Sequence, residues 1–196
     1  FLGMVLERFA PLCDARADSY HANLFRANAV ALRHHIDEQC WDGKWYLRAF
    51  YDDGTPIGGQ ESEECRIDLL SQSFAVFFGM PDKVRVSGAL DCALERLVDR
   101  EYRIVKLFDP PFENTVHNPG YIKAYPPGIR ENGGQYTHAA IWMAAALLEA
   151  GRANEGWELL DMINPTARCT DAELAQQFKT EPYYIPADVY GGKQGA

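Results

Sequence analysis

The stretch RADSYHANLFRANAVALRHHIDEQ, residues 16–39, has the periodicity of a long amphipathic α-helix. Its apolar side chains recur every three or four residues, which places them on one side of a helix. That side is broad, and a broad apolar side is typical of a helix that packs between neighbouring helices. The residues that form it are Tyr20, Leu24, Phe25, Ala27, Ala29, Ala31, Leu32 and Ile36. The stretch therefore predicts a mainly α fold.

The same pattern recurs along the rest of the chain. Further helices are predicted over residues 66–80, 83–99 and 131–150, in a segment beginning at Asn154, and over 174–179 after the capping-box sequence Thr170–Glu173. The aromatic residues 45–51 predict a short hairpin strand. Residues 101–130 have no helical pattern and form a long proline-rich loop, and loops of this length are often functional. We therefore expect paired helices with short turns on one side and long functional loops on the other.

Charge and composition exclude several classes of protein. The 196 residues include 19 Lys and Arg against 28 Asp and Glu, a formal net charge of −9, so nucleic acid is not expected as a partner. The longest apolar run, Ala139–Leu148, is about half of the ~20 residues that span a bilayer, so we expect no membrane segment in this chain. The five cysteines lack metal-binding or paired spacing. We therefore expect buried free thiols, no metal site and a cytoplasmic location.

The strongest candidate site is YIKAYPPGIRENGGQYTH, residues 121–138. Glycine lets backbone N–H groups approach an anion, and a helix N-terminus favours negative charge. Gly133 and Gly134, just before a predicted helix, therefore predict an anion site within reach of His138. The alternative is a helix entry whose glycines only turn the chain and whose histidine satisfies a core hydrogen bond. The flanking tyrosines and arginine favour a site.

A second candidate site is WDGKWYLRAFYDDG, residues 41–54. Aromatic rings beside Arg and Asp can bind a sugar, which makes Trp45, Arg48 and Asp52 candidates. An equally compatible alternative is a hairpin whose rings fill the core and whose Arg48 pairs with Asp52. Glu181 and Asp188, both close to tyrosines, could act as acid and base in glycoside cleavage, although helix capping is a simpler role for them.

Four segments of the chain resemble the catalytic domain of glycoside hydrolase family 94: WDGKWYLRAFYDDG, CRIDLLSQSFAV, LFDPPFENTVHNPGYIKAYPPGIRENGGQYTHAAIW and EPYYIPADVY. That family contains cellobiose, chitobiose and β-1,2-oligoglucan phosphorylases and the C-terminal region of cyclic β-1,2-glucan synthases. The likeness spans residues 41–190 in the same order and is closest to the cyclic-glucan-synthase branch. It implies a partial (α/α)6 toroid of paired helices, in which residues 1–196 are a fragment of the catalytic domain, truncated at both ends.

The resemblance also implies inverting phosphorolysis of a β-linked glucoside or glucan, which gives α-glucose 1-phosphate. Inorganic phosphate would be a co-substrate, and no metal or organic cofactor is implied. His138 matches the family's phosphate-binding histidine, and Arg130 and Tyr125 match positions that line the acceptor-sugar subsite. Glu131, Tyr121 and the segment around Trp45, Arg48 and Asp52 would support the sugar site.

Two parts of the family's active site are missing from this chain. The general-acid aspartate, which the family carries in a DWND-type motif, is expected upstream, and a Thr-Gly pair that completes the phosphate site is expected downstream. Tyr121 stands where cellobiose-specific members carry a carboxylate, which argues against a cellobiose preference. We therefore expect the fragment alone to be inactive, and its partners to be the glucan, phosphate and the remainder of a parent chain, which is cytoplasmic or the cytosolic part of a membrane-anchored protein.

Two alternatives from other classes remain open. One is an inverting hydrolase on the same toroid that uses carboxylates such as Glu181 and Asp188 to activate water. The other is a noncatalytic glycan-binding helical domain whose aromatic rings only stack on sugars.

Overall fold

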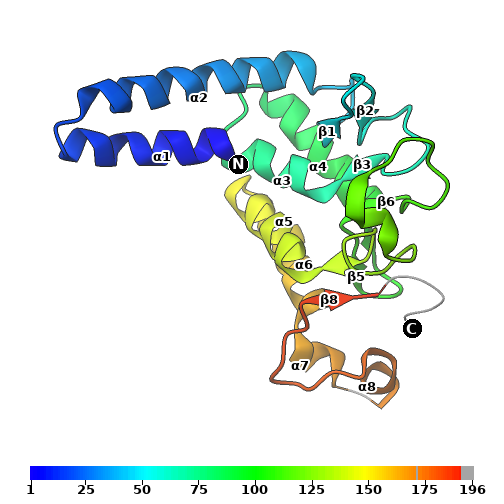
Figure 1. Cartoon of the computed structure of the whole chain (residues 1–196). Coiled ribbons are helices and arrows are strands. Elements are labelled where there is room, and N and C mark those ends of the chain that lie inside the picture. Colours follow the sequence, from blue (N-terminus) through cyan, green and yellow to red (C-terminus); the bar gives the residue numbers. More distant parts are fainter. Residues whose placement is uncertain (171, 191–196) are drawn as a thin grey trace.

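The computed structural model describes residues 1–170 and 172–190. These residues are mainly helical, as the sequence predicts, and each strand is only two residues long (Figure 1). The helices are α1 (Leu2–Ala15), α2 (Ser19–Gln39), α3 (Leu69–Phe77), α4 (Lys83–Leu97), α5 (Thr137–Glu149), α6 (Ala153–Ile163), α7 (Pro165–Arg168) and α8 (Ala172–Phe178), with the 3-10 helix η1 (Gly120–Ala124). The strands are β1 (Ala49–Phe50), β2 (Pro56–Ile57), β3 (Ile67–Asp68), β4 (Val98–Asp99), β5 (Ile104–Val105), β6 (Phe108–Asp109), β7 (Gln135–Tyr136) and β8 (Asp188–Val189).

The longer helices lie in pairs. α1 and α2 form a hairpin that projects from the body of the molecule, while α3 packs with α4 and α5 with α6 (Figure 1). Ala17, with a φ of 57°, turns the chain between α1 and α2. Asp18 then caps α2, because its carboxylate accepts the backbone N–H of His21. The ion pair between Arg33 and Glu7 joins the two helices at 2.5 Å. This pairing of successive helices agrees with the predicted partial toroid.

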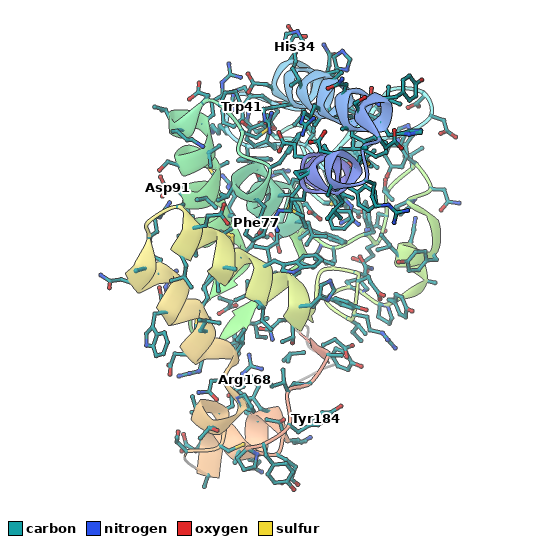
Figure 2. All side chains as sticks on the ribbon, turned by 90° about the vertical axis from the view of Figure 1, so that its left-hand side faces the viewer. His34, Trp41, Phe77, Asp91, Arg168 and Tyr184 are labelled. Atoms are coloured by element: carbon teal, nitrogen blue, oxygen red, sulfur yellow. The ribbon has the colours of Figure 1, made fainter. Side chains whose placement is uncertain are left out.

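The core lies between α3, α4, α5 and α6. Its largest aliphatic members have less than 2% exposure and include Leu69, Met80, Leu90, Leu97, Met143, Leu147 and Leu159. α5 and α6 approach closely at Gly156, where a Cβ atom would lie 2.9 Å from the carbonyl oxygen of Ala144. Figure 2 shows the α1–α2 hairpin end-on above this core, with Phe77 of α3 between the hairpin and α5.

Two helices begin later than the sequence predicts. α3 begins at Leu69, because the carboxylate of Asp68 accepts the backbone N–H groups of the first turn and ends the preceding strand. α5 begins at Thr137 and not at the start of the ENGG sequence. There, residues 129–132 close a tight turn through a bridge between Ile129 and Asn132, and strand β7 follows. The prediction of a helix over residues 131–136 is therefore wrong.

The remaining predictions concern caps, cysteines and membrane segments. Asn154 lies inside α6 and does not cap it, since Arg152 is the N-cap residue. Asp171, in the predicted capping box, lies outside the described residues. All five cysteines are free, as predicted, but only Cys13 and Cys65 are fully buried. Among the helices that the structure describes, none combines the length and apolar character needed to cross a membrane.

Candidate functional site

The loop between α4 and α5 folds around one buried amide, that of Asn132. The side chain is 0% exposed. Its Oδ1 accepts the backbone N–H of Phe112 at 2.7 Å, and its Nδ2 donates to the carbonyl oxygens of Phe112 and Tyr125, both at 2.8 Å. A satisfied amide in a buried setting holds the groups that it joins in one arrangement. Asn132 therefore fixes where Tyr125 lies relative to the turn at residues 129–132.

Gly133 and Gly134 pack this loop and, contrary to the sequence prediction, do not lie directly before a helix. Both are buried, and β7 separates them from α5. A Cβ atom at Gly134 would lie 2.9 Å from the carbonyl oxygen of Gly128 and 3.0 Å from that of Arg130. Gly133 has a φ of 82°, and a Cβ atom there would lie 3.0 Å from Cβ of Pro111. The glycines are needed because backbone segments approach too closely for a side chain.

Arg130 is at the centre of a charged and aromatic cluster. Its Nε lies 3.9 Å from Oε2 of Glu131 and 3.7 Å from Oδ2 of Asp188, and its Cζ lies 5.5 Å from the ring centroid of Tyr125. The side chain is 46% exposed, so the guanidinium can reach a ligand. Tyr125 and the carboxylates of Asp188 and Glu131 raise the pKa of Arg130 further above its ordinary value. The structure thus brings together Arg130, Glu131 and Tyr125, three of the predicted sugar-site residues.

His138 lies in the first turn of α5 and is exposed. Its ring meets two aromatic rings edge-on, Tyr136 at 4.5 Å and Trp142 at 4.9 Å between centroids. Burial raises the pKa of Tyr136, and the neighbouring Glu131 carboxylate adds to the rise. Tyr136 therefore links His138 to the cluster around Arg130. Within the described part of the chain no side chain caps α5, so the positive end of the helix dipole at this turn favours an anion.

In the segment 41–54, the aromatic side chains Trp45 and Tyr46 lie in the core. Trp45 is 1% exposed, and its Nε1–H donates to the carbonyl oxygens of Gly58 at 2.8 Å and Arg66 at 3.1 Å. The prediction that Trp45 offers a ring face to a sugar is therefore wrong, because the whole ring is in the core. Arg48 pairs with the buried Asp68 at 2.5 Å, and not with Asp52. The predicted hairpin itself is confirmed, since β1 pairs with β2.

Asp52 and Tyr121 lie on the outside of neighbouring loops. Asp52 is exposed in the turn between β1 and β2. Tyr121 is 68% exposed on η1. Neither side chain contacts Arg130 in an ion pair or a ring contact among the described residues. Of the predicted sugar-site residues, these two, Trp45 and Arg48 are therefore not part of the Arg130 cluster.

Two further sets of contacts, which sequence reasoning missed, join the α4–α5 loop to the β1–β2 hairpin and to the segment between β2 and β3. The ring of His117 stacks on Tyr51 at 4.7 Å between centroids, and its Nε2 lies 3.0 Å from Oδ2 of Asp53. The carboxylate of Glu64 accepts the backbone N–H groups of residues 113, 114 and 115 at 2.7 to 3.0 Å. Lone loop residues at these distances along the sequence give no periodic signal that would reveal such contacts.

The last strand closes the site from a distant part of the sequence. β8 pairs antiparallel with β7, so that Asp188 lies opposite Tyr136, and the backbone N–H of Thr137 donates to the carbonyl oxygen of Ala187 at 2.9 Å. Glu181, which the sequence pairs with Asp188, is exposed in the segment before this strand. Within residues 1–170 and 172–190, no group of His, Cys, Asp and Glu side chains could hold a metal ion.

The structure thus combines paired helices with an exposed cluster of aromatic and charged side chains, the kind of surface that can bind a sugar. Comparison with known proteins gives the family. Residues 1–195 match the family model described as the glycosyl hydrolase 94 superfamily, catalytic domain, and the chain belongs to this family. The resemblance drawn from the sequence is thus confirmed.

Among curated proteins, the chain is 46% identical over 191 residues to the cyclic beta-(1,2)-glucan synthase NdvB of Rhizobium meliloti (strain 1021), which covers 97% of this chain and 7% of that protein. It is 32% identical over 161 residues to the 3-O-beta-D-glucopyranosyl-beta-D-glucuronide phosphorylase of Paenibacillus borealis, covering 82% of this chain and 20% of that one. It is 30% identical over 180 residues to the N,N'-diacetylchitobiose phosphorylase of Vibrio furnissii, covering 91% and 22%. The chain thus spans less than a quarter of the length of each of these relatives. They support a carbohydrate-active, glycosyl-transferring family.

Proposed function

We propose that this chain supplies the phosphate-binding and acceptor-sugar-binding side chains of an inverting glycoside phosphorylase domain that acts on β-linked glucosides or glucans. His138 binds inorganic phosphate, while Arg130, Glu131 and Tyr125 hold the acceptor sugar. The observation that carries this proposal is the position of the exposed His138 ring. It lies at the uncapped N-terminal turn of α5 and is joined through Tyr136 to the Arg130 cluster.

Phosphate is the nucleophile of the proposed reaction. A ring N–H of His138 and the positive end of the α5 dipole stabilise its negative charge. One phosphate oxygen bonds to the anomeric carbon while the glycosidic C–O bond breaks on the opposite face, so a β-linked glucoside gives α-glucose 1-phosphate. The leaving oxygen takes its proton from a carboxylic acid that we place outside this chain. No cofactor and no metal ion takes part in the proposed reaction.

The acceptor sugar is held by complementary groups on the other side of Tyr136. The guanidinium of Arg130 donates to hydroxyl oxygens, the carboxylate of Glu131 accepts from hydroxyl groups, and the ring of Tyr125 packs against the apolar face of a pyranose. Tyr121, exposed on η1, can extend this surface toward longer substrates. Arg48, paired with the buried Asp68, supports the loops behind the site, and neither Arg48 nor the exposed Asp52 touches the sugar.

We further propose that these residues form part of a larger catalytic domain. Large apolar side chains are exposed on α1 and α5 and next to α1, and gathered exposed apolar residues mark surfaces that another part of a protein covers; they include Phe1, Leu2, Phe9, Leu12, Ile141 and Trp142. Ring contacts connect this surface to His138, from Phe1 to Phe74 at 5.8 Å, from Phe74 to Trp142 at 5.2 Å and from Trp142 to His138 at 4.9 Å. Other helices of the toroid cover this surface in the proposed domain.

The product identifies the reaction class. We expect the intact protein, incubated with β-linked gluco-oligosaccharides, to release α-glucose 1-phosphate only when phosphate is added. Free glucose released equally with and without phosphate would show a hydrolase. Binding of glucan without any product would show a noncatalytic domain. We expect the purified 196-residue chain alone to release no glucose 1-phosphate, and measurable release would contradict the proposal that the domain is larger.

A hydrolase that uses Glu181 and Asp188 is the second candidate, and the structure favours it less. Oδ2 of Asp188 is buried and faces the guanidinium of Arg130 at 3.7 Å, so an attacking water has no access to that oxygen. Glu181 is exposed and belongs to no ion pair among the described residues. The phosphate dependence of the product decides between the two.

A further inference from the structure

Asp188 occupies a position that connects both halves of the proposed site. Its backbone, in β8, pairs with β7, which ends two residues before His138. Its side chain reaches Arg130, with Oδ2 of Asp188 lying 3.7 Å from Nε of the guanidinium. The 187–189 segment is therefore fixed to the start of α5 by backbone hydrogen bonds and reaches the sugar side by a carboxylate.

The carboxylate oxygen Oδ2 of Asp188 faces the guanidinium of Arg130. The side chain is 20% exposed, and its Oδ2 is buried without a hydrogen-bond partner among the described residues. Oε2 of Glu131, on the same turn as Arg130, is buried and unpartnered in the same way. Two buried carboxylate oxygens thus face the Nε side of one guanidinium, at 3.7 and 3.9 Å. Buried acceptors without a donor are costly, so these oxygens favour a guanidinium held against them.

The backbone at Arg130 also needs to be held in place. Arg130 has a φ of 48°, which places a non-glycine residue in the left-handed region. Its side chain makes no hydrogen bond within the described residues, and nearly half of it is exposed. With the Nε side facing the carboxylates, the two terminal nitrogens of the guanidinium remain free for a ligand.

We propose that Asp188 is a positioning residue for the acceptor-sugar site, acting through Arg130. It holds the Nε side of the guanidinium so that the terminal nitrogens form a fixed pair of donors for adjacent sugar hydroxyls. The inference rests on the proposed function and extends it to a residue that lies in β8, outside the sequence segment that contains the rest of the cluster. Because Asp188 does not touch His138, its role concerns the sugar and not phosphate.

The test uses steady-state kinetics of the intact protein in both reaction directions. Asp188→Asn keeps the shape of the side chain and removes its charge. We expect the KM for the acceptor sugar to rise about fivefold, the effect of losing one partly exposed ion pair, while the KM for phosphate stays unchanged. Asp188→Glu, which restores the charge, should recover part of the affinity. Asp161→Asn is the matched control. Asp161 is an exposed residue of α6 that pairs with Arg103, so its loss should change neither the acceptor KM nor the phosphate KM.

A double-mutant cycle with Arg130→Ala separates positioning from a general structural role. If Asp188 acts through Arg130, Asp188→Asn has no further effect on the acceptor KM once Arg130 is truncated. An undiminished effect in that background, or an equal rise in the phosphate KM, would overturn the inference. Wild-type protein that shows no phosphate-dependent cleavage would overturn the proposed function and the inference with it, whereas active wild type without the coupling overturns the inference alone.

Discussion

The α5–α6 helix pair and the α4–α5 loop, residues 101–134, are neighbours that are held together in different ways. The helix pair buries aliphatic side chains such as Leu147 and Leu159, and Gly156 lets the two helices approach closely. The loop buries polar groups instead. Asn132, 0% exposed, makes three hydrogen bonds to loop backbone, and Glu64, which lies outside the loop, accepts three backbone N–H groups of the loop.

The hydrogen-bonded loop is better suited than the helix pair to hold functional side chains in fixed positions. Apolar packing is tolerant of exchange between side chains of similar volume, whereas a hydrogen-bonded loop depends on particular donors and acceptors. The loop presents Tyr125 and Arg130 at fixed positions because of those bonds. The helices supply a rigid support, from which α5 presents His138.

The largest effect should come from the helix pair. Leu147→Ala removes a fully buried side chain between α5 and α6, and we expect the free energy of unfolding to fall by about 3 kcal/mol. Urea unfolding followed by far-UV circular dichroism measures it. The nearby Glu149→Ala is the control, because Glu149 is exposed on α5 and its truncation should cost little. Equal losses at both positions would show that α5 does not pack as described.

A smaller and more local effect is expected in the loop. Asn132→Ala leaves the N–H and C=O of Phe112 and the C=O of Tyr125 without a partner, which should cost about 2 kcal/mol. Amide hydrogen exchange should become faster across residues 108–134 while helix α5 keeps its protection. The exposed Asn114→Ala serves as control. Faster exchange in α5 to the same degree would show that loop and helix pair are one cooperative unit.

The smallest expected effect is the loss of one loop contact, that of Asp53, at acidic pH. The backbone N–H and side chain of Thr55 and the ring of His117 lower the pKa of Asp53 from its ordinary value of 3.8 to about 2. A lowered folded-state pKa means that the charged Asp53 stabilises the loop contact above about pH 4, and that this contribution is lost as the pH falls toward 2. Hydrogen exchange of residues 115–119 between pH 5 and 2 measures it. Asp53→Asn should remove the acid sensitivity of this segment, and an unchanged pH profile would contradict the assignment.

The helices could be predicted from the sequence because apolar spacing reports packing directly. The stretch 16–39 predicted α2, and 83–99 predicted α4 to within two residues. The start of α5 could not be predicted in this way. Glu131 to Gly134 resemble a helix entry in composition, but the loop folds them into a turn, because Asn132 is bonded to residues distant in sequence.

The site was predictable only in part, for the same reason. His138, Arg130, Glu131 and Tyr125 lie within one short segment, so their proximity follows from the sequence. Asp188 joins them through a strand pairing that no local pattern indicates. Trp142 could have been found, since it follows His138 by one helical turn.

In the segment 41–54 the sequence predicted a sugar-binding residue, Trp45, that the structure places in the core. Aromatic residues between turns have the same composition whether they fill a core or bind a sugar. The position of Trp45 between the backbone carbonyls of Gly58 and Arg66 decides for the core. Composition alone therefore identifies the rings but not the side of the loop on which they lie.

The most direct test of the central claim, that the loop and α5 together form a phosphate and sugar site, is the phosphate KM of His138→Ala in the intact protein. We expect it to rise at least about tenfold, with the sugar KM little changed, since an anion loses a hydrogen-bond donor at the helix N-terminus. His34→Ala, at an exposed position on α2, is the matched control. A phosphate KM that stays at the wild-type value in His138→Ala would contradict the account.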